Sequence, residues 1–197
     1  MKVYLYTYAY DAIKQEGYKS LAMFDKNSEH CKNALWTHKH SAKSENIDDI
    51  LAYLEKTFEG RLRSICVVTE IAPVEDYAHP YLNYLVHHAD VISFELNQLI
   101  NDGLVEAIYC KDLRQTALSD ATYENIYKIE NMNKLDLEPC DWHLCEKAEY
   151  KGLSPWATIK HYMLVLKKGY IPPEYITLEV DNSKNGKFNI SVLARKP

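Results

Sequence analysis

Glycine is scarce and widely spaced in this chain, and this spacing limits the folds it can adopt more than any other feature. The 197 residues contain six glycines, at positions 17, 60, 103, 152, 169 and 186, so no two are closer than 17 residues. A dinucleotide-binding GxGxxG loop, a Walker A loop and a GxSxG nucleophile elbow each need two glycines close together. The sequence therefore excludes all three. A phosphate ligand would have to be held by side chains or by the start of a helix.

Hydrophobic periodicity predicts several strands. Residues 64–72 (SICVVTEIA) are a nearly continuous apolar run rich in β-branched residues, which is typical of a central strand covered on both faces. Residues 2–8 alternate between two faces and predict another strand. Further strands are expected at residues 91–94 and 105–110, and a hairpin over residues 175–180 and 188–194, around Asn185-Gly186.

Helices are expected between these strands. The clearest covers residues 47–58, with an apolar stripe on one side, Asn46 as N-cap and Gly60 after its end. Ser154-Pro155 suits the start of a helix over residues 156–168. Weaker patterns predict helices at residues 10–16, at 27–38 with Asn27 as N-cap and Ala34 and Leu35 inward, from 79 to 89, near 96–100, and at 122–129.

This combination of elements predicts an α+β protein, with helices packed on a mixed β-sheet and a C-terminal β-hairpin. Residues 1–112 are expected to form an N-terminal α+β core. Residues 113–197 are expected to supply a helical segment, a helix and the hairpin, packed on the same core.

Charge and composition exclude several classes of partner. The formal net charge of −5 argues against nucleic acid. No apolar run approaches the roughly 20 residues that a membrane-spanning helix needs. The N-terminus turns polar after Ala9, too early for a secretory signal. Five cysteines, an odd number without a tight repeated pair, fit a reducing compartment. We therefore expect a soluble cytoplasmic protein.

Glu70 is the leading candidate for a catalytic residue. It lies near the end of the most apolar predicted strand. A carboxylate there is either solvated, or buried with a raised pKa that suits it to acid–base catalysis. Tyr6 and Tyr8 are expected to line the adjacent cleft. This pattern favours a small group-transfer or hydrolytic enzyme that acts on a small-molecule ligand. The structural alternative is that Glu70 pairs with Arg61 or Arg63.

The opening of the chain has a further likeness. Leu5-Tyr6-Thr7-Tyr8, followed by residues 12–18 (AIKQEGY), forms a predicted strand and then a helix that ends in glycine. This opening resembles the start of ADP-ribosyltransferase-like folds, which also use a glutamate from a later strand. The resemblance implies that role for Glu70. The histidine or arginine of the family's first strand is replaced here by tyrosine or threonine.

Cysteine and histidine offer a third kind of chemistry. Cys31, His38 and His40 are candidate metal ligands, or a nucleophile with its base, and the order of Cys31 and His143 is that of papain-like enzymes. No CxxC pair is present, and structural zinc normally needs four ligands. A solvated loop is the simpler interpretation, so no metal site is predicted. No motif identifies a cofactor.

A protein without chemistry of its own is the alternative function. The 16 tyrosines against four phenylalanines are consistent with a tyrosine-rich contact surface, or with the codon bias of an AT-rich genome. A non-catalytic interaction module, such as a bacterial effector or inhibitor delivered to a host cell, would need a protein partner. The sequence leaves both functions open.

Overall fold

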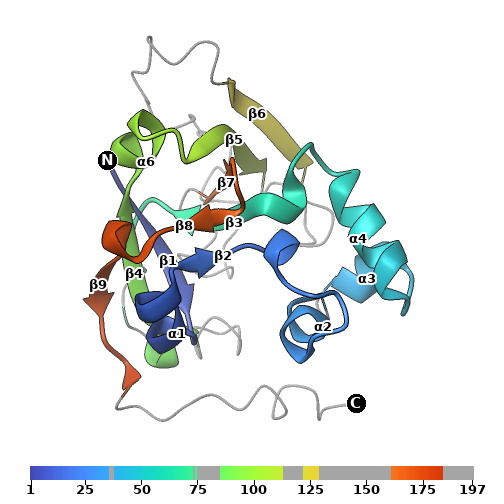
Figure 1. Ribbon diagram of the computed structural model, residues 1–197, viewed down its shortest axis with the longest axis horizontal. Coiled ribbons are helices and arrows are strands. Elements are labelled where there is room, and N and C mark those ends of the chain that lie inside the picture. Colours follow the sequence, from blue (N-terminus) through green and yellow to red (C-terminus); the bar gives the residue numbers. More distant parts are fainter. Residues whose placement is uncertain (36–37, 73, 75–84, 113–121, 129–160, 184–197) are drawn as a thin grey trace, which may run out of the picture.

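The computed structural model confirms the α+β class (Figure 1). It describes residues 1–35, 38–72, 74, 85–112, 122–128 and 161–183. Within these ranges no helix combines the length and the apolar character needed to span a bilayer.

Nine strands are described. Seven of them form one sheet in the order β6-β5-β7-β3-β1-β4-β9, and β2 pairs with β8 in a second, two-stranded sheet. Every described pairing is antiparallel. The strands are β1 (Lys2–Thr7), β2 (Tyr18–Lys19), β3 (Ser64–Val68), β4 (Asp90–Glu95), β5 (Val105–Asp112), β6 (Thr122–Lys128), β7 (His161–Leu166), β8 (Tyr170–Ile171) and β9 (Thr177–Val180).

Short helices connect and flank the strands, and several of them lie between β1 and β3 in the sequence. The α-helices are α1 (Tyr10–Glu16), α2 (Glu29–Leu35), α3 (Lys39–Ala42), α4 (Ile47–Glu55) and α6 (Leu96–Asn101). The 3-10 helices are η1 (Leu21–Met23), η3 (Arg61–Arg63) and η7 (Pro173–Tyr175).

The sheet is closely paired on both sides of its centre and open at the centre itself. Strand β1 pairs with β4 along its whole length, from Lys2 opposite Glu95 to Thr7 opposite Asp90. Strand β3 pairs with β7 along its whole length too. Between β1 and β3, however, only Tyr4 and Val68 form a residue pair in the described sheet. The two strands therefore separate towards the end of β1 and the start of β3.

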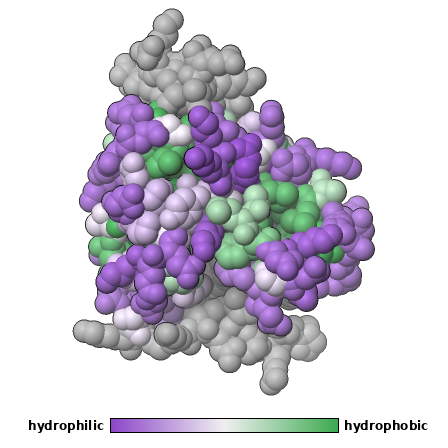
Figure 2. All heavy atoms as spheres, in the orientation of Figure 1, coloured by the Kyte–Doolittle hydropathy of each residue, from purple (hydrophilic) through white to green (hydrophobic). Residues whose placement is uncertain are grey.

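Two groups of apolar side chains make up most of the described core. The larger group covers one face of the sheet and includes fully buried Val3, Val67 and Leu164. A separate group joins α2 to α4 through Leu35 and Ile50. Figure 2 shows a mostly hydrophilic surface with an apolar area gathered over this helical part of the molecule. The helices thus have a core of their own beside the sheet.

Two predicted helices are strands in the structure, so these two predictions were wrong. Residues 122–128 form β6 at the edge of the sheet, and the interval predicted as a helix over residues 156–168 contains β7 near its centre. The side chains of Tyr162 to Leu166 are all at most 1% exposed. A continuous apolar run that is covered on both faces is typical of a strand. Tyr162, Met163 and Leu166 belong to this run, so their helical spacing does not by itself indicate a helix.

Smaller differences concern where elements begin and end. The helix expected at residues 27–38 is described as Glu29–Leu35. It begins later than expected because the Ser28 hydroxyl, and not Asn27, accepts a hydrogen bond from the Cys31 amide. Ala34 is exposed, whereas Leu35 is buried as predicted. The predicted N-cap Asn46 is confirmed, since its side chain accepts from the Asp48 amide.

Only the first arm of the predicted C-terminal hairpin lies within the described residues. That arm is β9, which pairs with β4 at the edge of the seven-stranded sheet. The Asn185-Gly186 turn and residues 188–194 lie outside the described residues.

Candidate functional site

A cavity of about 390 Å³ lies where β1 and β3 separate. If the register of the Tyr4–Val68 pair continued, Thr7 would lie opposite Ile65. Thr7 lines the cavity, and so do the two sequence neighbours of Ile65, Ser64 and Cys66. The remaining wall comes from the chain that connects the two strands. The lining residues are Thr7, Ala9, Ala12, Ile13, Glu16, Gly17, Tyr18, Lys19, Leu21, Phe24, His30, Ala34, Arg61, Ser64 and Cys66.

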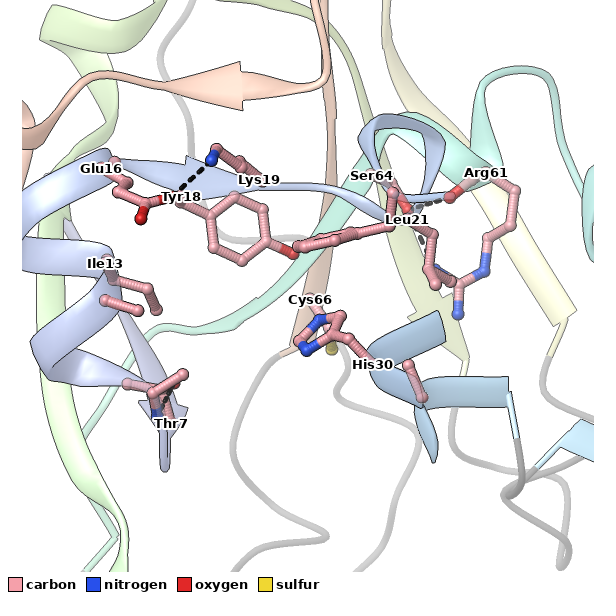
Figure 3. A pocket seen from close by; sticks show the side chains of 15 residues that line it. Thr7, Ile13, Glu16, Tyr18, Lys19, Leu21, His30, Arg61, Ser64 and Cys66 are labelled. Carbon is pink, nitrogen blue, oxygen red and sulfur yellow. Dashed lines mark hydrogen bonds and ion pairs between the residues drawn. The ribbon is translucent and has the colours of Figure 1, made fainter. Parts of the chain in front are cut away.

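Most of the wall is apolar, and a few polar groups converge within it. Figure 3 shows Tyr18, His30 and Cys66 directed to the same space, with Arg61 on one side and Ile13 on the other. An apolar cavity with a few convergent polar groups is the usual form of a small-molecule site, and this volume falls within the range of such sites.

The first side of the cavity depends on a tight turn after α1. Gly17 ends this helix with φ at +78°, and a Cβ there would lie 2.5 Å from the carbonyl oxygen of Ile171. Only glycine combines this backbone conformation with such a close approach. The turn leads directly into β2, whose first residue is Tyr18. The glycine thus sets the position from which Tyr18 reaches the cavity.

Arg61 enters the cavity from η3. One terminal nitrogen of its guanidinium donates to the Ser64 hydroxyl at 2.9 Å, and that hydroxyl donates to the Arg61 carbonyl oxygen at 2.7 Å. The guanidinium also lies over the ring of Phe58, 5.6 Å from its centre. These contacts orient a permanent positive charge at the cavity wall.

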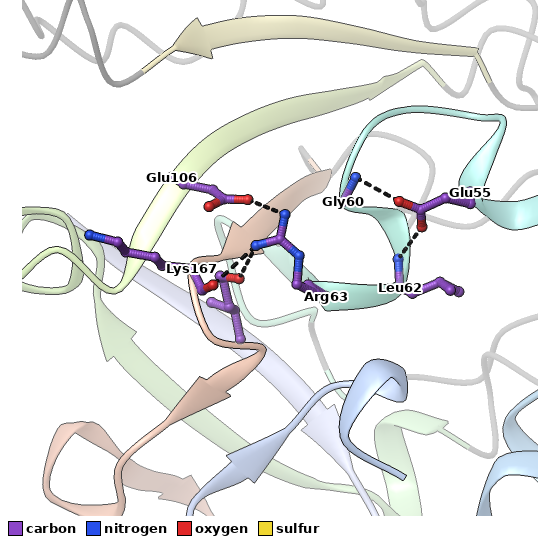
Figure 4. Close-up of polar contacts among 7 residues, drawn as sticks. Glu55, Gly60, Leu62, Arg63, Glu106 and Lys167 are labelled. Atoms are coloured by element: carbon purple, nitrogen blue, oxygen red, sulfur yellow. Dashed lines mark hydrogen bonds and ion pairs between the residues drawn. The ribbon is translucent and has the colours of Figure 1, made fainter. Parts of the chain in front are cut away.

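The helix η3 is held from its other side as well (Figure 4). Arg63 pairs with Glu106 at 2.5 Å and donates to the carbonyl oxygens of Leu166 and Lys167. Glu55 accepts hydrogen bonds from the Gly60 and Leu62 amides. The two arginines of η3 therefore have different roles, since Arg61 lines the cavity and Arg63 joins η3 to the sheet.

Tyr18 supplies a neutral hydroxyl. Burial raises its pKa well above the ordinary value of 10.0, a change that the nearby Arg61 charge opposes and Cys66 reinforces. The phenol therefore stays protonated at neutral pH and can donate a hydrogen bond. Within the described part of the chain, its hydroxyl has no hydrogen-bond partner.

Two further features complete the wall. The rings of Phe24 and His30 lie 4.1 Å apart between centres, with 30° between their planes. The Lys19 ammonium donates to the Glu16 carboxylate at 2.6 Å, and this hydrogen bond lowers the pKa of Glu16. These two opposite charges form an ion pair at the rim of the cavity.

The residues predicted as catalytic lie outside this cavity. Glu70 is exposed and follows the end of β3 by two residues. Tyr6 is half-buried on β1, and its hydroxyl accepts a hydrogen bond from the Ala72 amide at 2.8 Å. Tyr8 is 41% exposed. None of the three is among the lining residues, and their catalytic role stays a prediction.

The thiol and metal candidates are only partly described. Cys31 is 1% exposed within α2, and burial raises the pKa of its thiol. His38 is half-buried. The side chain of His40 and the whole of His143 lie outside what the structure describes. Among the described residues, no three of the types that ligate metals are grouped to hold an ion.

Sequence reasoning missed the cavity residues as a group. The sequence suggests only a pairing with Glu70 for Arg61, and for Cys66 only a place in the apolar run of residues 64–72. Tyr18 and Arg61 are 43 positions apart, and no short motif contains both. A hydroxyl, a thiol and a guanidinium at such spacing have no sequence signature.

Comparisons with known proteins add no family or relative. No protein-family model matches the chain, and no curated protein and no solved structure is significantly similar to it. The role that the resemblance to ADP-ribosyltransferase-like folds implies for Glu70 stays a prediction.

Proposed function

We propose that this protein binds a small molecule in the cavity between β1 and β3. The observation that carries the proposal is the convergence of Tyr18, Arg61 and Cys66 on one cavity with mostly apolar walls. Polar side chains brought together from separate elements give a ligand orientation, and the apolar wall supplies contact area. The Glu70 hypothesis would need a different cleft, so Glu70→Gln serves to separate the two.

Binding is tested by thermal unfolding against a library of nucleotides, sugars, amino acids and organic acids. A ligand at 100 times its dissociation constant adds about 2.7 kcal/mol to the free energy of unfolding. For a chain of this size, that addition raises the melting temperature by roughly 5–11 °C. The same ligand is expected to slow alkylation of the half-exposed Cys66, measured by peptide mass spectrometry, without changing that of buried Cys31.

Two variants of α2 locate the binding site. Ala34 lines the cavity and is exposed, so Ala34→Trp is expected to obstruct the cavity and abolish the shift. Its neighbour Asn33 is exposed and does not line the cavity, so Asn33→Trp is expected to retain the shift. Glu70→Gln is also expected to retain it. A shift that Glu70→Gln abolishes and Ala34→Trp preserves would favour the strand-end site instead. A library without any hit would favour a protein partner.

A further inference from the structure

The cavity contains a hydroxyl group that forms no hydrogen bond within the described part of the protein. It belongs to Tyr18, whose partly buried side chain is directed into the cavity from β2 (Figure 3). Hydroxyl groups away from water are normally hydrogen-bonded, because leaving one without a partner costs free energy. A phenol is a better donor than acceptor, because its ring draws electron density from the oxygen. The ligand group that suits this position is therefore a hydrogen-bond acceptor.

The surroundings of Tyr18 favour an uncharged acceptor. Burial raises the pKa of the Tyr18 phenol above its ordinary value of 10.0, although the nearby Arg61 charge acts in the opposite direction. A negative charge on the Tyr18 oxygen is therefore unfavourable even with Arg61 close by. A charged ligand group beside this oxygen would lose its hydration in the same way. A neutral acceptor, such as a carbonyl oxygen or a ring nitrogen, loses much less.

The aromatic part of the wall limits the shape of the ligand. The Phe24 and His30 rings, whose centres are 4.1 Å apart, both line the cavity, and so does the Tyr18 ring. Aromatic side chains favour planar rings, through offset stacking or edge-to-face contact. The aliphatic side chains of Ile13 and Leu21 add apolar contact without a hydrogen-bonding requirement. The volume of about 390 Å³ is near the lower end of the range for small-molecule sites, which suits one ring or two fused rings.

We propose that the cavity selects an uncharged planar aromatic molecule that carries a hydrogen-bond acceptor. The Tyr18 hydroxyl donates to the acceptor, and Phe24 and His30 contact the ring. This inference rests on the proposed function, which states that the cavity binds a small molecule, and adds the class of that molecule.

The test compares acetophenone with three ligands that each differ from it in one property. Isopropenylbenzene has a CH₂ group in place of the carbonyl oxygen, cyclohexyl methyl ketone lacks the planar ring, and benzoate carries a negative charge. Their dissociation constants for the wild-type protein are measured by ligand-observed NMR titration. Acetophenone is expected to bind about three- to tenfold more tightly than isopropenylbenzene, because only the ketone accepts a hydrogen bond from Tyr18. It is also expected to bind more tightly than cyclohexyl methyl ketone and benzoate.

Two tyrosines on paired strands provide a matched control. Tyr18→Phe removes the hydroxyl and keeps the ring, so it is expected to weaken binding of acetophenone about three- to tenfold and to leave isopropenylbenzene unchanged. Tyr170 lies on β8, which pairs with β2, and does not line the cavity. Tyr170→Phe removes the same group outside the cavity, and is expected to preserve the preference for acetophenone. The comparison of the four ligands in the wild-type protein does not depend on whether either variant folds.

The outcomes separate this inference from the function it rests on. The ligand class is wrong if acetophenone binds no more tightly than isopropenylbenzene, cyclohexyl methyl ketone or benzoate, or if a folded Tyr18→Phe variant keeps the preference for the ketone. Small-molecule binding still stands in these cases if any compound slows Cys66 alkylation. If none of the four ligands and no library compound raises the melting temperature or slows that alkylation, the proposed function fails, and the ligand class fails with it.

Discussion

The two neighbours of β1 in the sheet differ sharply. On one side, β4 pairs with every residue of β1 from Lys2 to Thr7. On the other side, the described pairing with β3 consists of Tyr4 and Val68. The same strand is therefore part of a closed ladder along one edge and borders an opening along the other.

The difference shows how a site can form inside an antiparallel sheet. All described lining residues of the cavity lie between Thr7 and Cys66 in the sequence, so the cavity is built by the connection between β1 and β3 and by the ends of those strands. In a closed ladder, backbone hydrogen bonds occupy the space between the strands, and the side chains project to the two faces of the sheet. Where the ladder opens, that space becomes available to a ligand.

The largest expected effect is on the free energy of unfolding, when a buried residue of the closed region is compared with a residue of the cavity wall. Leu164 is fully buried on β7, so Leu164→Ala is expected to lower the free energy of unfolding by about 2–5 kcal/mol. Cys66 borders the cavity, and Cys66→Ala is expected to cost no more than about 1 kcal/mol. Urea unfolding measures both. Equal losses would show that the cavity edge is packed as closely as the core.

An intermediate effect is expected at the edge of the closed region. Glu179 on β9 accepts hydrogen bonds from buried Ser93 at 2.6 Å and from Lys2 at 2.9 Å. Glu179→Ala removes both and is expected to cost about 1–3 kcal/mol, since it leaves the Ser93 hydroxyl without this acceptor. Exposed Glu174 provides the control, because Glu174→Ala is expected to change little.

The same carboxylate predicts a pH dependence. The hydrogen bonds from Ser93 and Lys2 lower the pKa of Glu179 below its ordinary value of 4.5. A lowered pKa in the folded state adds stability that is present above the unfolded value and is lost as the pH falls through the folded value. The difference in stability between wild type and Glu179→Ala is therefore expected to shrink as the pH falls below 4.5. A constant difference across this range would contradict the assignment.

The smallest expected effect concerns the chain that follows β3. The Tyr6 hydroxyl accepts from the Ala72 amide and so joins this segment to β1 close to where the ladder opens. Tyr6→Phe removes the acceptor, and a loss of about 1 kcal/mol is expected in urea unfolding. Tyr8→Phe at the exposed neighbouring position is expected to cost less. A loss of ligand binding in Tyr6→Phe without a loss of stability would instead support the catalytic prediction for Tyr6.

Local patterns predicted the elements that depend on local physics. The helix over residues 10–16, the Asn46 cap and the strands β1, β3, β4 and β5 follow from periodicity, caps and β-branched runs. The errors at β6 and β7 have a different origin. The segments TYENIYK and HYMLVL contain aromatic and β-branched residues that can occur in a helix or in a strand. They form strands because β6 pairs with β5, and β7 pairs with β3.

The sequence by itself determined the class of the fold, the central position of residues 64–68 and the absence of glycine-rich nucleotide loops. These properties depend on neighbouring residues, whose spacing is visible in one dimension. Only the tertiary structure decided that β7 lies between β5 and β3. It also decided that β1 and β3 separate beyond the Tyr4–Val68 pair, towards the end of β1 and the start of β3. The cavity with Tyr18, Arg61 and Cys66 follows from that separation, because its shape depends on which strands pair and for how long.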